Sequence, residues 1–333
     1  MKFGPVPTAQ AEGAVLAHAL QLAGGKLKKG HLLQPEDIAA LEAEGVADVI
    51  VARLEADDVA ENLAATGLAG AIVPDEGLSG LSIEAAFTGR VNLRAKAAGI
   101  LRVEAEAIAA INAVDPMITL ACLPPFQRVT AGMMVATVKI IPYAVPQKSL
   151  NQACDVARNA LSLIEPVITS ARLILSEVAG QKPSLNDKAV SAIGGRLDAL
   201  GVALTHVETV PHTRAAIAAA IKAASEELVL VLTASATSDI EDVMPGGLRD
   251  AGGQVIRFGM PVDPGNLLVL GRRDAQSVIG LPGCARSPAL NGADWVLERV
   301  ICGVPLGSHD IAAMGVGGLL KEIPTRPQPR EGK

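Results

Sequence analysis

The chain has 333 residues, a length typical of two compact domains. Half of the residues are hydrophobic, which is enough for sizeable cores and excludes wholesale disorder. Only 2% of the residues are aromatic and the formal net charge is −6. A nucleic-acid-binding protein needs clustered basic side chains and aromatic platforms for bases, so no nucleic-acid partner is expected.

The cysteines indicate neither a disulfide framework nor a zinc site. Cys122, Cys154, Cys284 and Cys302 form no CxxC pair and have no nearby His at zinc-finger spacing. We interpret them as small buried apolar residues in a reducing compartment. No segment reaches the ~18 uninterrupted apolar residues of a membrane helix, and the first residues lack the apolar core of a signal peptide. A cytoplasmic protein without a membrane partner is therefore predicted.

The first half, residues 1–165, is predicted to be a mixed α+β region. Apolar spacing predicts a short helix over residues 9–20. Pro35, followed by two acidic residues, predicts the start of a helix that stops at Gly45. A strand over 46–51 and a helix over 55–66 follow. Short β-branched runs then predict a β-rich subdomain over about 69–148, with strands at 70–74, 89–93, 100–103, 117–123 and 133–141, a helix at 104–112, and a linking helix at 150–164.

The second half alternates regularly between strand and helix patterns. Strands are predicted at 172–178, 202–208, 228–232, 254–258, 267–270 and 278–281, and helices at 185–200, 213–225, 246–251 and 294–301. This order predicts an α/β domain over 166–305, a mostly parallel sheet with helices on both faces. The wholly apolar run Leu228–Leu232 is expected to be an interior strand. Residues 306–333 are predicted to be an extension whose Pro-rich tail from Pro324 is disordered.

Three loops of this domain carry polar side chains that suit a ligand. They span residues 184–188, 233–245 and 280–287, and they offer hydroxyls, carboxylates and the N–H groups of helix starts. These groups suit an anionic ligand and a divalent ion. Because ligands bind at the carboxyl ends of parallel strands, we expect the loops to converge on one cleft. The carboxylates of Asp187 and Asp242 should then lie within about 15 Å of each other if they share a metal.

The same loops carry a family resemblance. LNDKAVSAIGGRLDALG from Leu185, LVLVLTASATSDIEDVMP from Leu228 and IGLPGCARS from Ile279 stand in this order. Together they resemble the xDK, TGGTGxxxxDVTP and LPGxPxS segments of the molybdopterin-binding domain found in molybdopterin adenylyltransferases and molybdotransferases. LKKGHLLQPEDIAALEAEGVADVIVAR, from Leu27, also resembles a molybdotransferase segment. The middle of the chain matches more loosely, and we find no DGYA-type loop of the molybdotransferase active site.

The resemblance implies a pterin site and Mg²⁺-dependent phosphoryl chemistry. Molybdopterin would be ligand or substrate, with Mg²⁺ and ATP or another nucleotide as further ligands. Asp187 and Asp242 take the positions of the family's acidic residues, as catalytic groups and metal ligands. The residues implied to contact the cofactor are Thr233, Ser235, Thr237, Pro282, Gly283 and Ser287. Arg272, Arg273 and Arg286 could each contact the pterin phosphate, although a surface position is expected for at least two of them.

One departure from the family affects the expected activity. Where the family has Gly-Gly-Thr-Gly, this chain has Ala234, Ser235, Ala236 and Thr237, which forfeit the backbone freedom of glycine. The predicted function is therefore to bind or carry molybdopterin or its nucleotide or molybdate form. An active adenylyl- or molybdotransferase is one alternative, and a non-catalytic regulatory or scaffolding module is another. Other cofactor-biosynthesis enzymes and a second copy of the chain are conceivable partners.

Several of these residues also have purely structural interpretations. Ser184 and Asp187 have the spacing of a capping box, and Asp242 can cap the short helix that follows it. Pro282-Gly283 is also a common turn dipeptide. The five histidines form no HxxxH pair, and each is expected to be structural or on the surface.

Overall fold

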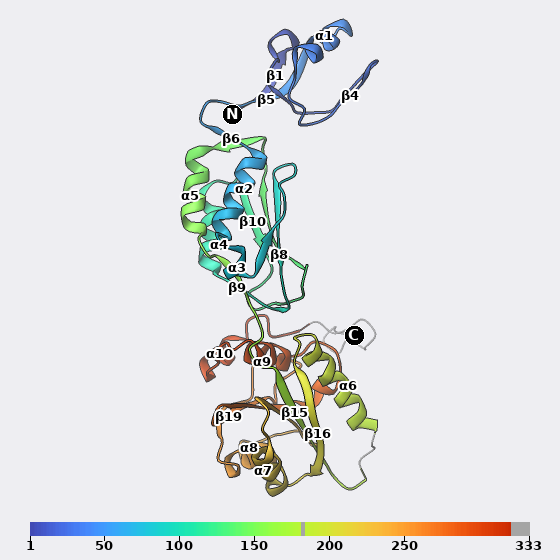
Figure 1. Ribbon diagram of the computed structural model, residues 1–333, viewed down its shortest axis with the longest axis vertical. Coiled ribbons are helices and arrows are strands. Elements are labelled where there is room, and N and C mark those ends of the chain that lie inside the picture. Colours follow the sequence, from blue (N-terminus) through green and yellow to red (C-terminus); the bar gives the residue numbers. More distant parts are fainter. Residues whose placement is uncertain (181–183, 321–333) are drawn as a thin grey trace, which may run out of the picture. The chain divides into compact units, whose positions relative to one another are not determined.

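The computed structural model describes residues 1–180 and 184–320, and the predicted disordered tail lies outside them. The chain divides into two compact units (Figure 1). The first contains residues 1–97 and 101–163, and the second contains residues 98–100 and the chain from Ile164 onward. Within the described residues, no helix combines the length and hydrophobicity needed to cross a membrane.

The N-terminal part of the first unit is a small sheet with one helix. Strands β1 (Lys2–Pro7), β5 (Asp48–Arg53) and β2 (Val15–Leu16) pair in the order β1-β5-β2, beside the hairpin β3 (Leu20–Leu22) and β4 (Gly25–Leu27). Helix α1 (Pro35–Ala43) begins at the proline and ends before Gly45, whose φ is +73°, as the sequence predicts.

The helix expected over residues 9–20 is wrong. The structure has a single 3-10 turn, η1 (Thr8–Gln10), followed by β2 and β3. Gly13 interrupts the segment with a φ of +72°, and Ala14 and Leu16 are buried in the core beneath the sheet. The apolar spacing therefore reflects burial in a sheet and not one face of a helix.

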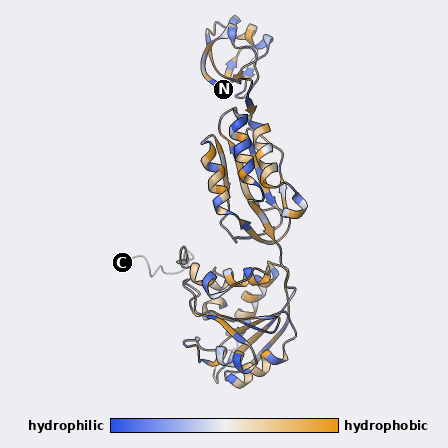
Figure 2. Cartoon of the chain, turned by 90° about the vertical axis from the view of Figure 1, so that its left-hand side faces the viewer, coloured by the Kyte–Doolittle hydropathy of each residue, from blue (hydrophilic) through white to orange (hydrophobic). Residues whose placement is uncertain are grey.

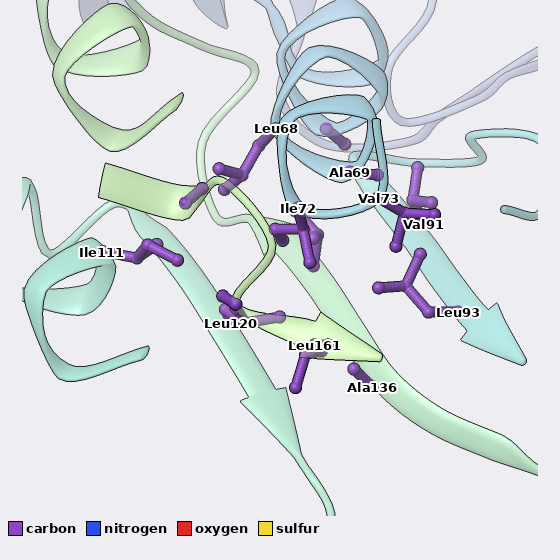
Figure 3. Packing of buried hydrophobic residues seen from close by; sticks show 14 of the residues in the cluster. Leu68, Ala69, Ile72, Val73, Val91, Leu93, Ile111, Leu120, Ala136 and Leu161 are labelled. Carbon is purple, nitrogen blue, oxygen red and sulfur yellow. The ribbon is translucent and has the colours of Figure 1, made fainter. Parts of the chain in front are cut away.

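The larger part of the first unit packs three helices against antiparallel strands. The core lies between α2, α4, α5 and the sheet, where Ile72 of α2 points toward the strands that carry Leu93 and Leu120 (Figure 3). The sheets are β10-β12-β8-β7, β11-β9-β14 and β13-β6. The elements are β6 (Asp58–Ala60), α2 (Glu61–Ile72), α3 (Glu76–Ser79), β7 (Leu81–Ile83), β8 (Arg90–Ala95), β9 (Gly99–Val103), α4 (Ala105–Val114), β10 (Ile118–Cys122), β11 (Arg128–Val129), β12 (Met134–Ile140), β13 (Ala144–Pro146), α5 (Gln147–Ala157) and β14 (Leu161–Ile164).

Two segments of the first unit have a different secondary structure from the one the sequence predicts. The strand expected at 70–74 is wrong, because residues through Ile72 belong to α2. Leu68, Ala69 and Ile72 share one helical face and are fully buried against the sheet. The linking helix expected over 150–164 ends at Ala157, and its last residues form β14.

The second unit is the α/β fold that the sequence predicts. Its six-stranded sheet has the order β16-β15-β17-β20-β19-β18, in which the first four strands are parallel and the last two pair antiparallel. The strands are β15 (Ser170–Glu177), β16 (Ala203–Pro211), β17 (Leu228–Leu232), β18 (Gln254–Phe258), β19 (Val269–Arg273) and β20 (Gln276–Leu281). The helices are α6 (Ser184–Asp198), α7 (Arg214–Ala223), α8 (Val243–Asp250), α9 (Gly292–Ile301) and α10 (Ser308–Ala313), with the 3-10 helix η2 (Gly283–Arg286).

Helices cover both faces of this sheet. Leu228, Leu230 and Leu232 pack on one side with α6 and α9, whereas Val229 and Val231 pack on the other with α7 and α8. All five residues of β17 have no exposed surface, and the strand lies between β15 and β20. The prediction of an interior strand is confirmed. The helices carry both hydrophobic and hydrophilic residues (Figure 2), as is expected of helices that cover a sheet with one face.

Candidate functional site

Three neighbouring parallel strands of the second unit end at the same edge of its sheet. Leu232 of β17 pairs with Leu175 of β15 on one side and with Leu281 of β20 on the other. The residues that follow these positions therefore leave the sheet side by side. This carboxyl edge is where open α/β sheets bind ligands.

The loop after β17 is joined to the turn after β20. The Thr233 hydroxyl donates to the Ser235 carbonyl at 2.7 Å, and Arg286 Nη2 donates to the Thr233 carbonyl at 2.8 Å. Thr233 and Thr237 are buried and Ser235 is exposed. The structure thus brings together two of the three segments that the sequence singles out.

The helix that begins with the third segment, α6, packs against η2 through Arg196 near its other end. Arg196 is buried, forms an ion pair with Asp294 of α9 and packs α6 against η2. Its guanidinium also donates to the carbonyls of Ala285, Ser287 and Ala289, at 3.0, 2.8 and 3.1 Å. The path of the chain after Pro282 is fixed by these bonds. The sequence signal for this residue was a charge on the apolar stripe of α6, beside Ile193 and Leu197.

Asp242 caps helix α8. Its carboxylate accepts from the backbone N–H of Val243 at 2.7 Å and from that of Ser238 at 3.0 Å, so both oxygens hold the loop backbone. The capping interpretation of Asp242 is confirmed. Asp187 is exposed in the first turn of α6, whereas the side chain of its proposed capping partner, Ser184, lies outside the description.

The metal site implied by the resemblance rests on these two carboxylates alone. Within residues 1–180 and 184–320, no three His, Cys, Asp or Glu side chains lie close enough to hold a metal ion. The shared site of Asp187 and Asp242, and their common cleft, stay predictions.

A hydrogen-bonded chain through His212 holds the start of the same loop. His212 follows β16, and its Nδ1 lies 2.8 Å from the Ser176 hydroxyl at the end of β15. Its Nε2 lies 2.9 Å from the Ser235 hydroxyl, while the N–H of Ala234 donates to Ser176 at 3.0 Å. Sequence reasoning missed this histidine. Its position directly after a strand at the carboxyl edge was the available signal.

The direction of these bonds follows from the burial of Ser176. Its oxygen accepts from Ala234, and its own proton must be donated because the side chain is almost fully buried. Nδ1 of His212 is the acceptor within reach, so the N–H on Nε2 is the donor to the Ser235 hydroxyl. In this arrangement His212 orients Ser235 and does not remove its proton.

The Pro282-Gly283 segment forms a 3-10 turn. The N–H of Ala285 donates to the Pro282 carbonyl at 2.9 Å, and the Ser287 hydroxyl accepts from the N–H of Ala289 at 3.3 Å. Gly283 is exposed, its φ is not in the left-handed region, and a Cβ there would meet only Nη1 of Arg286 at 3.5 Å. Neither strain nor crowding requires a glycine at this position.

Arg286 carries a positive charge with no carboxylate beside it among the residues that the structure describes. The residue is partly buried, and its Nε is buried without a hydrogen-bond partner. Burial lowers the pKa of its guanidinium, and no neighbouring charge among the described residues raises it again. Arg272 and Arg273 lie elsewhere, because they pair with Ser277 and Gln276 at the start of β20, the opposite edge of the sheet.

Comparisons with known proteins identify no function for the chain. A family model described as a domain of unknown function, DUF8806, matches residues 5–53, a small part of the chain. No curated protein matches.

Solved structures of molybdenum cofactor proteins show weak similarity. A molybdopterin biosynthesis moea protein from Pyrococcus horikosii is 13% identical, covers 91% of this chain and 76% of its own, and has a TM-score of 0.31. A molybdenum cofactor biosynthesis protein B is 13% identical over 40% of this chain and 88% of its own, with a TM-score of 0.28. A protein of the same pathway from Pyrococcus furiosus is 12% identical over 96% and 66%, with a TM-score of 0.22. Such values do not establish a shared fold or function.

Proposed function

We propose that the second unit binds molybdopterin, or its nucleotide or molybdate form, at the carboxyl edge of its sheet, and that the protein acts in molybdenum cofactor biosynthesis as a binding or carrier protein. One observation carries the proposal. Two of the three segments with the sequence pattern of molybdopterin-binding domains are bonded to each other through Arg286 and Thr233, and the helix that follows the third, α6, packs on η2. This contact between two segments that are far apart along the chain supports a shared site.

The bonding of the loop favours binding over group transfer. Asp242 uses both carboxylate oxygens on backbone N–H groups, and the Thr233 hydroxyl is bonded within the loop. Adenylyl transfer joins two anions and needs a metal and phosphates held in line, where a misplacement of about 1 Å can cost ~100-fold in rate. Binding needs only donors for an anion and a surface for the pterin ring, and neither requires glycines at residues 234–237.

If Mg²⁺ takes part, Asp187 and Asp242 are the carboxylates that would hold it. The ion would supply charge neutralisation between phosphate groups. The chain's own contribution is to keep Asp242 at the start of α8 and to orient the Ser235 hydroxyl through His212.

Calorimetric titration of the full chain with molybdopterin and with MgATP, separately, tests the proposal. We expect saturable molybdopterin binding and no adenylylated product when both are present. Undetectable molybdopterin binding overturns the proposal, and robust MgATP-dependent turnover replaces the carrier with a transferase. Asp242→Asn should weaken molybdopterin binding only modestly, because asparagine also caps helices and a carboxylate does not attract an anion. The exposed neighbour offers the control Glu241→Gln.

A further inference from the structure

The segments after β17 and β20 meet around one guanidinium. Arg286 Nη2 bonds the Thr233 carbonyl, Nη1 lies beside the exposed Gly283, and Nε is buried without a partner. We propose that Arg286 is the anion-binding residue of this edge and that it takes a phosphate group, either a phosphate monoester or a diphosphate. The inference deepens the proposed function by naming the residue that holds the phosphate end of the ligand.

Three other arginines around this sheet form ion pairs within the protein. Arg172 bonds Glu226 and Glu208, Arg196 bonds Asp294, and Arg214 bonds Asp250. Arg286 donates a hydrogen bond to one backbone carbonyl, that of Thr233, and forms no ion pair among the described residues. A partly buried charge without a counter-ion is costly, so Arg286 gains more from a bound anion than an arginine that already has an ion pair. The planar guanidinium presents parallel N–H donors that match phosphate oxygens, so a phosphate is the ligand that best offsets this cost.

The side of the guanidinium open to a ligand is the one next to Gly283. The exposed glycine has no side chain to cover Nη1, which lies 3.5 Å from the place a Cβ would occupy. The backbone there tolerates larger residues because its φ is not left-handed. A large side chain at residue 283 should therefore cover Nη1 while leaving the charge of Arg286 intact.

Titration of the full chain with inorganic pyrophosphate tests the proposal. Arg286→Gln should weaken pyrophosphate binding by at least about 10-fold, because a charge-assisted bidentate contact is lost. Arg286→Lys, which keeps the charge but loses the planar donors, should show a smaller loss. Arg273→Gln is the matched control. It removes the same charge from the opposite edge of the same sheet and should change binding by less than about twofold.

Thermal unfolding without ligand separates a binding role from a structural one. Replacing Arg286 removes a buried N–H that has no partner, and this gain offsets the lost bond to the Thr233 carbonyl. Arg286→Gln should therefore shift the unfolding midpoint by less than about 3 °C. A large fall in the midpoint together with unchanged pyrophosphate affinity overturns the proposal. If Arg286→Gln does not fold, Gly283→Leu decides: weaker pyrophosphate binding supports the inference, and unchanged binding overturns it.

The two proposals fail in different ways. If the unaltered protein binds molybdopterin and Arg286→Gln binds both ligands equally well, the role of Arg286 is wrong and the proposed function stands. If pyrophosphate binding depends on Arg286 but molybdopterin does not bind, the anion site stands and the proposed function is wrong.

Discussion

At the carboxyl edge of the second unit, individual side chains take their roles from partners far away in the sequence. His212 connects Ser176 and Ser235, which lie 36 and 23 residues from it. Arg196 bonds Asp294, 98 residues away, and three carbonyls around η2. Each of these side chains satisfies buried or partly buried polar groups that would otherwise be left unpaired.

Replacing His212 should destabilise the second unit. His212→Ala leaves the buried hydroxyl of Ser176 without an acceptor, so we expect the free energy of unfolding to fall by about 1–3 kcal/mol. Denaturant titration measures the change. The exposed His206 provides a control, because His206→Ala should change the same quantity by less than about 0.5 kcal/mol. Equal effects of the two variants would contradict the role given to His212.

Glu226 should make the second unit sensitive to acid. Burial alone would raise the pKa of this carboxyl, but hydrogen bonds from Arg172 and from the N–H groups of Ser225 and Glu226 hold the pKa below its ordinary value. Because the pKa of Glu226 is lower in the folded state than in the unfolded state, its carboxylate stabilises the fold. This stabilisation is fully present above the unfolded-state pKa of about 4.5, and it is lost as the pH falls through the folded-state pKa.

Denaturant titrations at several pH values test the contribution of Glu226. Glu226→Gln should lower the free energy of unfolding at pH 7 and flatten its decline below about pH 4.5. Glu177→Gln, at an exposed position in the same unit, should leave the acid decline as it is. An unchanged decline in the Glu226 variant would show that other carboxylates control it.

At the scale of elements, helices α7 and α8 approach each other closely where α8 has two glycines. A Cβ on Gly247 would lie 2.9 Å from Cγ2 of Ile217 and 3.1 Å from the carbonyl oxygen of Arg214, both on α7. The glycine therefore sets the distance between the two helices on this face of the sheet. Gly195 of α6 is different, because nothing lies within 4 Å of the place its Cβ would take.

Alanine at the two glycines should change stability in opposite directions. Gly247→Ala crowds the contact between α7 and α8 and should lower the free energy of unfolding by about 1–2 kcal/mol. Gly195→Ala adds helix propensity in open space and should raise it by about 0.5–1 kcal/mol. Denaturant titration of both variants and of the unaltered chain measures the two changes in the free energy of unfolding. A stabilising Gly247→Ala would mean that the helices move apart at little cost.

At the scale of the whole molecule, the two units have separate cores. Leu68 is fully buried in the first core and Leu230 in the second, and no residue belongs to both clusters. Units with their own cores can unfold as separate cooperative transitions. The four cysteines are free thiols, so no disulfide links the units.

Calorimetry should resolve a contribution from each unit. Leu68→Ala and Leu230→Ala each leave a cavity that costs about 2–5 kcal/mol, and each should shift the transition of its own unit. The other transition should stay in place. One single transition shifted equally by both variants would show that the units unfold together.

The architecture of the second unit was predictable from the sequence. Its strands alternate with helices, and the apolar run Leu228–Leu232 required an interior strand. The first unit was less predictable, since residues 9–20 form short strands and residues 70–72 end a helix. Short apolar runs fit either periodicity, and only packing against a particular sheet or helix decides between them.

The sequence by itself determined the element order of the second unit and the loops at the ends of its parallel strands, because hydrophobic periodicity and turn residues act over a few neighbouring positions. The tertiary structure alone decided which side chains of those loops are paired. His212 joins three segments, and Arg286 has no carboxylate beside it within the described residues, whereas the cap formed by Asp242 is local and was visible in the sequence. Pairing depends on contacts between segments tens of residues apart, and a local pattern carries no information about such contacts.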